Sequence, residues 1–317
     1  MKHARWVFVG LAACTAGQHQ QDFTEPLSAG ERGKLLPARP TVRFVAVGDT
    51  GMGNPGQRQV AQAMAKTCAE YGCDFAILLG DNFYLDGVKS PEDPQWKTRF
   101  EEIYHVLDIP FYAVLGNHDY GEGLGYDARR GEAQVAYGSR PGKWNMPGRY
   151  YHFAVGNVEF FALDTTLPMY LAAEAQERTV TAWIGQSQAL WKIALGHHPL
   201  LSNGPHGNAG AYEGLPFLPI LRGGGVKAFL EEVVCGKVDL YLSGHDHSRQ
   251  YLAETCKGTE LVVSGAGAKT TTLKERNPHH FQSLELGFLY VHIKENTLTA
   301  AFINGEGTVD FTRVLTK

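Results

Sequence analysis

Short apolar runs recur along the chain, and several end in glycine followed by a polar side chain. Runs of this length, rich in β-branched and aromatic residues and bounded by glycine, predict buried strands. Residues 55–70 instead place Val60, Ala63, Met64 and Cys68 at helical spacing. Strands alternating with helix predict parallel β-α-β units and an α/β domain. The predicted strands cover residues 42–47, 75–79, 111–115, 158–163, 191–195, 238–243, 261–264, 286–294 and 297–303.

Five of these strands end in a glycine that precedes a residue able to bind a metal ion. These residues are, in order, Asp49, Asp81, Asn117, His197 and His245. Ligands of open α/β sheets bind at the carboxyl ends of strands, and glycine lets the chain turn sharply there. A single Gly–Asp pair is usually an ordinary turn, whereas five such endings indicate one shared centre. Oxygen and imidazole ligands without thiolates suit iron, zinc or manganese.

The amino terminus has the pattern of a secretory signal. Lys2 and Arg5 precede an apolar run over residues 6–13, which is too short to cross a bilayer because a helix needs about 20 residues for that. The tetrapeptide Leu11–Ala12–Ala13–Cys14 resembles a bacterial lipobox, which predicts cleavage before Cys14 and a lipid on its sulfur. An ordinary signal cleaved nearby stays open as the alternative.

Residues 15–40 are polar and lack apolar periodicity, which is typical of a tether. We therefore expect a signal peptide over residues 1–13, a lipidated Cys14 with a flexible tether over 14–40, and a single domain over 41–317. The expected location is the bacterial periplasm or cell envelope, with lipid attachment to a membrane, or otherwise secretion.

Composition narrows the possible partners. The 317 residues carry a formal net charge of −4, and lysine and arginine are scattered rather than clustered. This distribution gives no electrostatic basis for a nucleic-acid partner.

Four cysteines remain after Cys14, namely Cys68, Cys73, Cys235 and Cys256. An oxidising compartment permits two disulfides among them, with three possible connectivities. Nearness in sequence favours Cys68–Cys73 and Cys235–Cys256, and buried free thiols are the alternative.

The strand-end motifs together resemble the calcineurin-like metallophosphoesterases, and within them the small, single-domain purple (tartrate-resistant) acid phosphatases. The resemblance runs from about Val42 to the end of the chain. It implies a metallophosphoesterase-type α/β fold, in which a β-sandwich is flanked by helices in four layers (α/β/β/α). Residues 41–317 would then form the catalytic domain. The motifs are Gly48–Asp49–Thr50–Gly51, Gly80–Asp81–Asn82–Phe83–Tyr84, Gly116–Asn117–His118–Asp119, Gly196–His197–His198–Pro199 and Gly244–His245–Asp246–His247.

The resemblance also implies a binuclear metal centre. Tyr84, three residues after Asp81, stands where purple acid phosphatases place a phenolate that binds ferric iron. The implied ferric (Fe3+) ligands are Asp49, Asp81, Tyr84 and His247. The implied ligands of a divalent ion (iron, zinc or manganese) are Asp81, Asn117, His197 and His245, with Asp81 bridging. His118 is expected to bind phosphate, and His206 to protonate the leaving group.

The implied activity is that of an acid phosphatase, a phosphomonoesterase in which a metal-bound hydroxide attacks a small phosphate ester. A phosphodiesterase or nucleotide hydrolase of the same superfamily is the first alternative. A non-catalytic, metal-binding surface lipoprotein is the second. The physiological substrate, the second metal and the oligomeric state do not follow from the sequence.

Four further expectations concern residues near the centre. Residues 120–150 are expected to form a long loop over the site. Asp119 and Asp246 are expected to orient the adjacent histidine side chains. Asp164 should be a turn or helix-capping residue, and His198 a neighbour that packs near the site.

Overall fold

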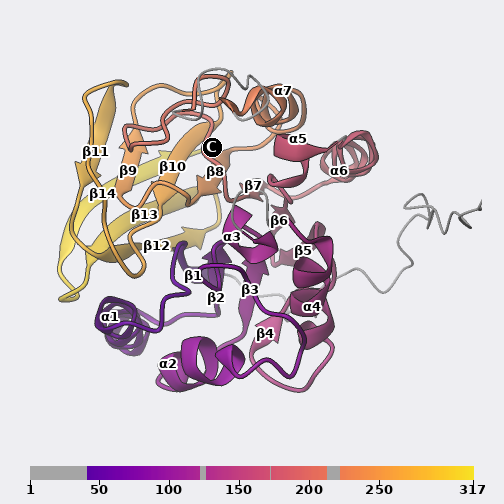
Figure 1. Ribbon diagram of the computed structural model, residues 1–317. Coiled ribbons are helices and arrows are strands. Elements are labelled where there is room, and N and C mark those ends of the chain that lie inside the picture. The colour runs from indigo at the N-terminus through magenta and orange to yellow at the C-terminus, as the bar shows by residue number, and fades with distance from the viewer. Residues whose placement is uncertain (1–40, 122–125, 172, 213–221) are drawn as a thin grey trace, which may run out of the picture.

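Two seven-stranded sheets lie face to face between helices in the computed structural model (Figure 1). It describes residues 41–121, 126–171, 173–212 and 222–317. The expected signal peptide, Cys14 and the tether lie outside the described residues. In the part of the chain that is described, no helix is long and apolar enough to cross a membrane.

The first sheet joins parallel strands from the start of the chain to antiparallel strands from its end. β1 pairs in parallel with β2 on one side and antiparallel with β12 on the other. The order across the sheet is β14 (Val309–Thr316), β13 (Thr297–Asn304), β12 (Gly287–Lys294), β1 (Thr41–Val47), β2 (Phe75–Leu79), β3 (Phe111–Val114) and β4 (Trp144–Asn145).

The second sheet has a parallel centre and antiparallel edges. β6, β7, β8 and β10 run parallel, whereas β5, β9 and β11 pair antiparallel with their neighbours. The order is β11 (His279–Ser283), β9 (Arg249–Leu252), β10 (Glu260–Ser264), β8 (Leu240–Ser243), β7 (Trp191–Leu195), β6 (Val158–Ala162) and β5 (Tyr151–Val155).

The core lies between the sheets and is rich in aromatic rings. Phe44 and Phe75 of the first sheet meet Phe160 of the second, with ring centroids 5.3 and 5.4 Å apart. Phe75 also meets Phe153, at 5.7 Å. All four side chains are buried. Each such burial stabilises the fold by about 1.5–3 kcal/mol, so this layer fixes the two sheets against each other.

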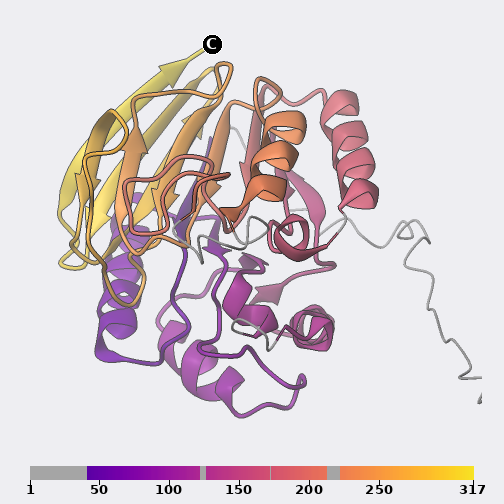
Figure 2. The same ribbon diagram turned by 45° about the horizontal axis from the view of Figure 1, so that its top comes forward.

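Helices cover the outer faces of both sheets (Figures 1 and 2). On the first sheet, Val60, Met64 and Ile103 belong to the central core cluster. On the second, Val180, Ile184, Val226 and Leu230 build a separate apolar layer. The helices are α1 (Pro55–Tyr71), α2 (Glu102–Tyr104) after a π-helical turn η2 (Lys97–Glu101), α3 (Asn117–Tyr120), α4 (Ala128–Gly138), α5 (Leu167–Tyr170), α6 (Glu174–Gln186) and α7 (Gly224–Val233). The α/β sandwich expected from the sequence is therefore confirmed.

Both favoured disulfides are present, Cys68–Cys73 and Cys235–Cys256. They close loops with sequence separations of 5 and 21 residues. A chain-entropy model gives stabilisation of about 2 kcal/mol for the shorter loop and about 3 kcal/mol for the longer. The longer bridge joins the segment after α7 to the turn before β10.

The expectation of a long loop over residues 120–150 is wrong. Helix α4 and strand β4 lie within it. Asp127 caps α4 by accepting a hydrogen bond from the backbone of Arg129 at 3.0 Å. Glycine, tyrosine and arginine dominate this stretch and mask its helical pattern, whereas the Asp cap was a usable signal.

Candidate metal centre

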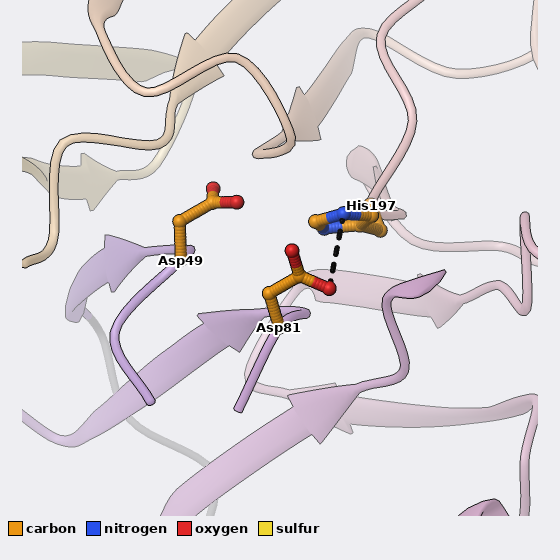
Figure 3. A group of neighbouring side chains, drawn as sticks. All are labelled: Asp49, Asp81 and His197. Carbon is orange, nitrogen blue, oxygen red and sulfur yellow. Dashed lines mark ion pairs between the residues drawn. The ribbon is translucent and has the colours of Figure 1, made fainter. Parts of the chain in front are cut away.

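The five strand ends singled out by the sequence converge on one point. Asp49, Asp81 and Asn117 follow β1, β2 and β3 of the first sheet, and His197 and His245 follow β7 and β8 of the second. Ligand atoms of Asp49, Asp81 and His197 all lie within 4.8 Å of one another (Figure 3). The expectation that these strand ends meet is confirmed.

The glycines before these residues are required by close approach. A Cβ on Gly116 would lie 2.3 Å from Asp81 Oδ1, and one on Gly244 would lie 2.6 Å from Asp49 Oδ2. The residues themselves turn sharply, since Asp49, Asp81 and His245 have φ values of 60°, 53° and 70°. Non-glycine residues rarely adopt this left-handed conformation, and such strain concentrates at functional sites.

The first ligand set surrounds the hydroxyl of Tyr84. This oxygen lies 2.9 Å from Asp81 Oδ2, 3.2 Å from Asp49 Oδ1 and 3.1 Å from His247 Nε2. His247 Nε2 is also 3.4 Å from Asp49 Oδ1. All four side chains are buried. The structure thus brings together the four residues expected to hold the ferric ion.

The second set surrounds Nε2 of His197. Asn117 Oδ1 and His245 Nδ1 each lie 3.1 Å from this nitrogen, and Asp81 Oδ1 lies 3.4 Å from it. Asp81 therefore presents Oδ2 to the first set and Oδ1 to the second. This is the arrangement needed for a bridging carboxylate.

Hydrogen bonds to carbonyls fix which imidazole nitrogens face the centre. His197 Nδ1 lies 2.9 Å from the Leu79 carbonyl, and His118 Nδ1 lies 2.7 Å from the Leu85 carbonyl. A carbonyl can only accept, so both Nδ1 atoms donate and both Nε2 atoms present lone pairs when the rings are neutral. His118 Nε2 points toward Asp81, 4.0 Å from its Oδ2.

The electrostatics of the site favour the binding of cations. Burial raises the pKa of Asp49 well above its usual range, and the charge of Asp81 adds to this effect against the opposing influence of His197. Burial, followed by the two carboxylates, raises the pKa of Tyr84. For Asp81, burial acts to raise the pKa, but the charges of His197 and His118 outweigh it. The pKa of Asp81 is therefore lowered.

The imidazoles of the site favour the neutral, metal-binding form. Burial lowers the pKa of His245 well below its usual value. Burial and then the charge of Lys269 lower the pKa of His247 to about 4. Neutral imidazoles, buried carboxylates and a phenol around one point form a donor set that bound cations would neutralise. The residues present therefore fit a pair of hard to borderline metal ions.

Asp119 does not orient the ring of His118, contrary to expectation. Its carboxylate accepts hydrogen bonds from the backbone N–H groups of Asn82 at 2.9 Å, Phe83 at 3.1 Å and Gly116 at 2.8 Å. Burial, and then the charge of Asp81, raise the pKa of Asp119 to about 7. Asp119 thus holds the turn that carries Asp81 to Tyr84, while a carbonyl orients His118.

Asp246 likewise organises a loop rather than its histidine neighbours. It accepts from the backbone N–H groups of His206 at 3.0 Å and Gly207 at 3.4 Å, and from the hydroxyl of Ser202. The ring of His206 consequently packs 4.1 Å from that of His245. Burial lowers the pKa of His206. The structure thus places the expected leaving-group histidine beside the second ligand set.

The expectations for His198 and Asp164 are confirmed. The buried His198 pairs its Nδ1 with the Thr165 hydroxyl at 3.0 Å. Asp164 Oδ1 accepts from the backbone of Thr166 and of Leu167, both at 3.1 Å, which makes it the turn residue before α5. Sequence reasoning missed Thr165, whose hydroxyl accepts from the backbone of His197 at 3.1 Å and fixes that turn.

Comparison with known protein families identifies the family of the chain that carries this centre. The calcineurin-like phosphoesterase family matches residues 42–249. The chain belongs to this family. This calcineurin-like phosphoesterase is 31% identical to tartrate-resistant acid phosphatase type 5 of Sus scrofa, over 91% of each chain. It is 30% identical to purple acid phosphatase 3 of Arabidopsis thaliana, over 90% of this chain and 82% of that protein.

Solved structures agree on the fold. The protein titled "GAP50 the anchor in the inner membrane complex of Plasmodium" superposes with a TM-score of 0.68 at 23% identity, over 87% of this chain and 89% of that one. PhoD superposes with a TM-score of 0.58 at 15% identity, over 88% and 69%. At these identities the likeness concerns the fold alone.

Family and relatives together establish the reaction class. This calcineurin-like phosphoesterase is a metal-dependent phosphomonoesterase, a hydrolase of phosphoric esters, as are its acid phosphatase relatives. The buried group of Asp49, Asp81 and His197 could hold a metal ion, which such an activity requires.

Proposed function

We propose that the two ligand sets hold a ferric and a divalent ion and that the enzyme is an acid phosphatase of the purple type. The ferric ion would bind Asp49, Asp81, Tyr84 and His247. The divalent ion, which is iron, zinc or manganese, would bind Asp81, Asn117, His197 and His245. The observation that carries this proposal is that the two oxygens of Asp81 face the two sets separately.

The protein side chains have distinct tasks in this proposal. When bound, the ions would supply Lewis-acid stabilisation of the phosphoryl oxygens and would activate water. Nε2 of His118 points toward Asp81, and this nitrogen binds a phosphoryl oxygen of the ester. His206 gives a proton to the departing alkoxide, so that an alcohol leaves. The loop held by Asp246 keeps that imidazole in place.

Replacing Tyr84 with phenylalanine tests the ferric assignment. The oxidised wild-type protein is expected to show a broad visible absorption band, because a phenolate bound to ferric iron absorbs visible light. The band should disappear in Tyr84→Phe, since the substitution removes the phenol oxygen that faces Asp49 and Asp81. The measurement is a visible spectrum of purified, oxidised protein together with its metal content.

A matched control is Tyr71→Phe, at a tyrosine that is 49% exposed. It should keep the full band. A colourless wild-type protein that binds two metal ions and cleaves phosphate esters would disprove the tyrosinate–ferric site. The metal-dependent reaction would still stand, but the phosphodiesterase alternative would reopen.

We also propose that residues 1–13 are a signal peptide and that lipid on Cys14 anchors the 41–317 catalytic domain through the 14–40 tether. The support is the sequence pattern alone. Mass spectrometry of protein expressed in bacteria is expected to find a diacylated amino-terminal Cys14 in the membrane fraction. The Cys14→Ala variant should lose the lipid. A mature chain that starts elsewhere without lipid would overturn the anchor and leave an ordinary signal.

A further inference from the structure

Lys269 lies at the edge of the metal centre and has none of the roles expected from the sequence. Lys269 follows β10 on a loop whose backbone is fixed at two points. The Ala268 carbonyl accepts from Asn54 Nδ2 at 3.0 Å, and the Thr271 N–H donates to the carbonyl of His247 at 3.0 Å. The loop therefore ties the lysine to the residue that completes the first ligand set.

The ammonium group of Lys269 faces the ring of Tyr84. Its Nζ lies 5.2 Å from the ring centroid, within the range of a cation–π contact. The ring of His118 lies 4.5 Å from the same tyrosine ring. Lys269 is half-buried, and among the described residues no carboxylate forms an ion pair with it. An ammonium group is thus held beside the site, and no carboxylate in the described part of the chain pairs with it.

The charges at the metal centre can balance without Lys269, so its ammonium group is available to bind a ligand. Asp49, Asp81 and a phenolate from Tyr84 would offset most of the charge of a ferric and a divalent ion, leaving a net charge of about +2. One hydroxide and the monoanion of a phosphate ester would neutralise that remainder. The additional charge of Lys269 therefore has no counterpart in a simple monoester with an uncharged leaving group.

We propose that Lys269 is a specificity residue that binds a second anionic group, carried by the leaving group of the phosphate ester. The inference rests on the proposed function, because the scissile phosphate is taken to lie at the metal centre beside Tyr84 and His118. Esters of carboxylate-bearing or further phosphorylated alcohols are the substrate class that gains from this contact. A charge-assisted hydrogen bond to the ammonium provides the selectivity.

A matched pair of substrates isolates the effect. Phenyl phosphate and 4-carboxyphenyl phosphate differ by one negative charge on the leaving group. We expect Lys269→Met to raise KM for the carboxylated ester by about 5- to 10-fold and to change KM for phenyl phosphate by less than about 2-fold. Lys269→Arg should restore most of the preference. Lys66→Met, at an exposed lysine of α1, is the charge-matched control and should change neither KM.

Binding measured without turnover separates this inference from the proposed function. Calorimetry of the metal-loaded protein with phenylphosphonate and 4-carboxyphenylphosphonate should show the carboxylated compound binding more tightly to wild type, with the difference lost in Lys269→Met. The preference should also weaken as salt is added. Equal losses for both compounds, or no loss, would overturn the role of Lys269. Absence of hydrolysis by wild type would refute the proposed function, whereas a preserved binding preference would still support the lysine.

Discussion

Replacing Asp81 with asparagine is expected to lower kcat/KM for a phosphate monoester by at least about 1,000-fold, because both of the proposed metal sites would lose a ligand. Asp81 Oδ2 lies 2.9 Å from the Tyr84 hydroxyl, and Oδ1 lies 3.4 Å from His197 Nε2. An amide keeps the shape of the group but removes its negative charge and one acceptor.

The measurement combines kinetics on phenyl phosphate with elemental analysis of the purified protein. Asp81→Asn should hold markedly less of both metals than wild type, while its circular dichroism stays that of a folded α/β protein. Asp108→Asn, the same change at an exposed position, is the matched control and should leave activity and metal content unchanged. Activity above one tenth of wild type with full metal content would show that Asp81 does not bridge.

The fold could be predicted from the sequence where its strands are fully buried. β1, β2, β7 and β10 are short apolar runs with little choice of conformation. β14 was missed because its burial alternates with exposure at the edge of the sheet. α6 was missed because only three of its residues, Gln176, Val180 and Ile184, are buried. Edge and surface elements depend on tertiary contacts that local pattern does not carry.

The convergence of the strand-end residues could be predicted because the requirements of their turns are local. A turn that brings a ligand to the centre needs a glycine where a side chain would collide, as at Gly116 beside Asp81. What the sequence could not predict are partners distant along the chain. Asp119 holds the turn after β2, 37 residues earlier, and Asp246 holds the His206 loop, 40 residues earlier. Nothing in a carboxylate's neighbours reveals such long-range hydrogen bonds.

Replacing His206 with alanine is expected to separate substrates by the basicity of their leaving groups. For an alkyl ester such as β-glycerophosphate, kcat should fall by about 100-fold or more, because the alkoxide leaves poorly without a proton. For p-nitrophenyl phosphate, the phenolate leaves readily, so kcat should fall by less than about 10-fold. A residue that only shaped the site would slow both esters equally.

The structure favours the unequal outcome because His206 is positioned without being one of the proposed metal ligands. Its ring packs 4.1 Å from His245, and its backbone is held by the carboxylate of Asp246 at 3.0 Å. Metal content should therefore remain that of wild type in His206→Ala. His105→Ala, at an exposed histidine, is the control for the substitution itself. Equal losses on the alkyl and aryl esters, with both metals retained, would remove His206 from proton transfer and leave the departing group to take its proton from water.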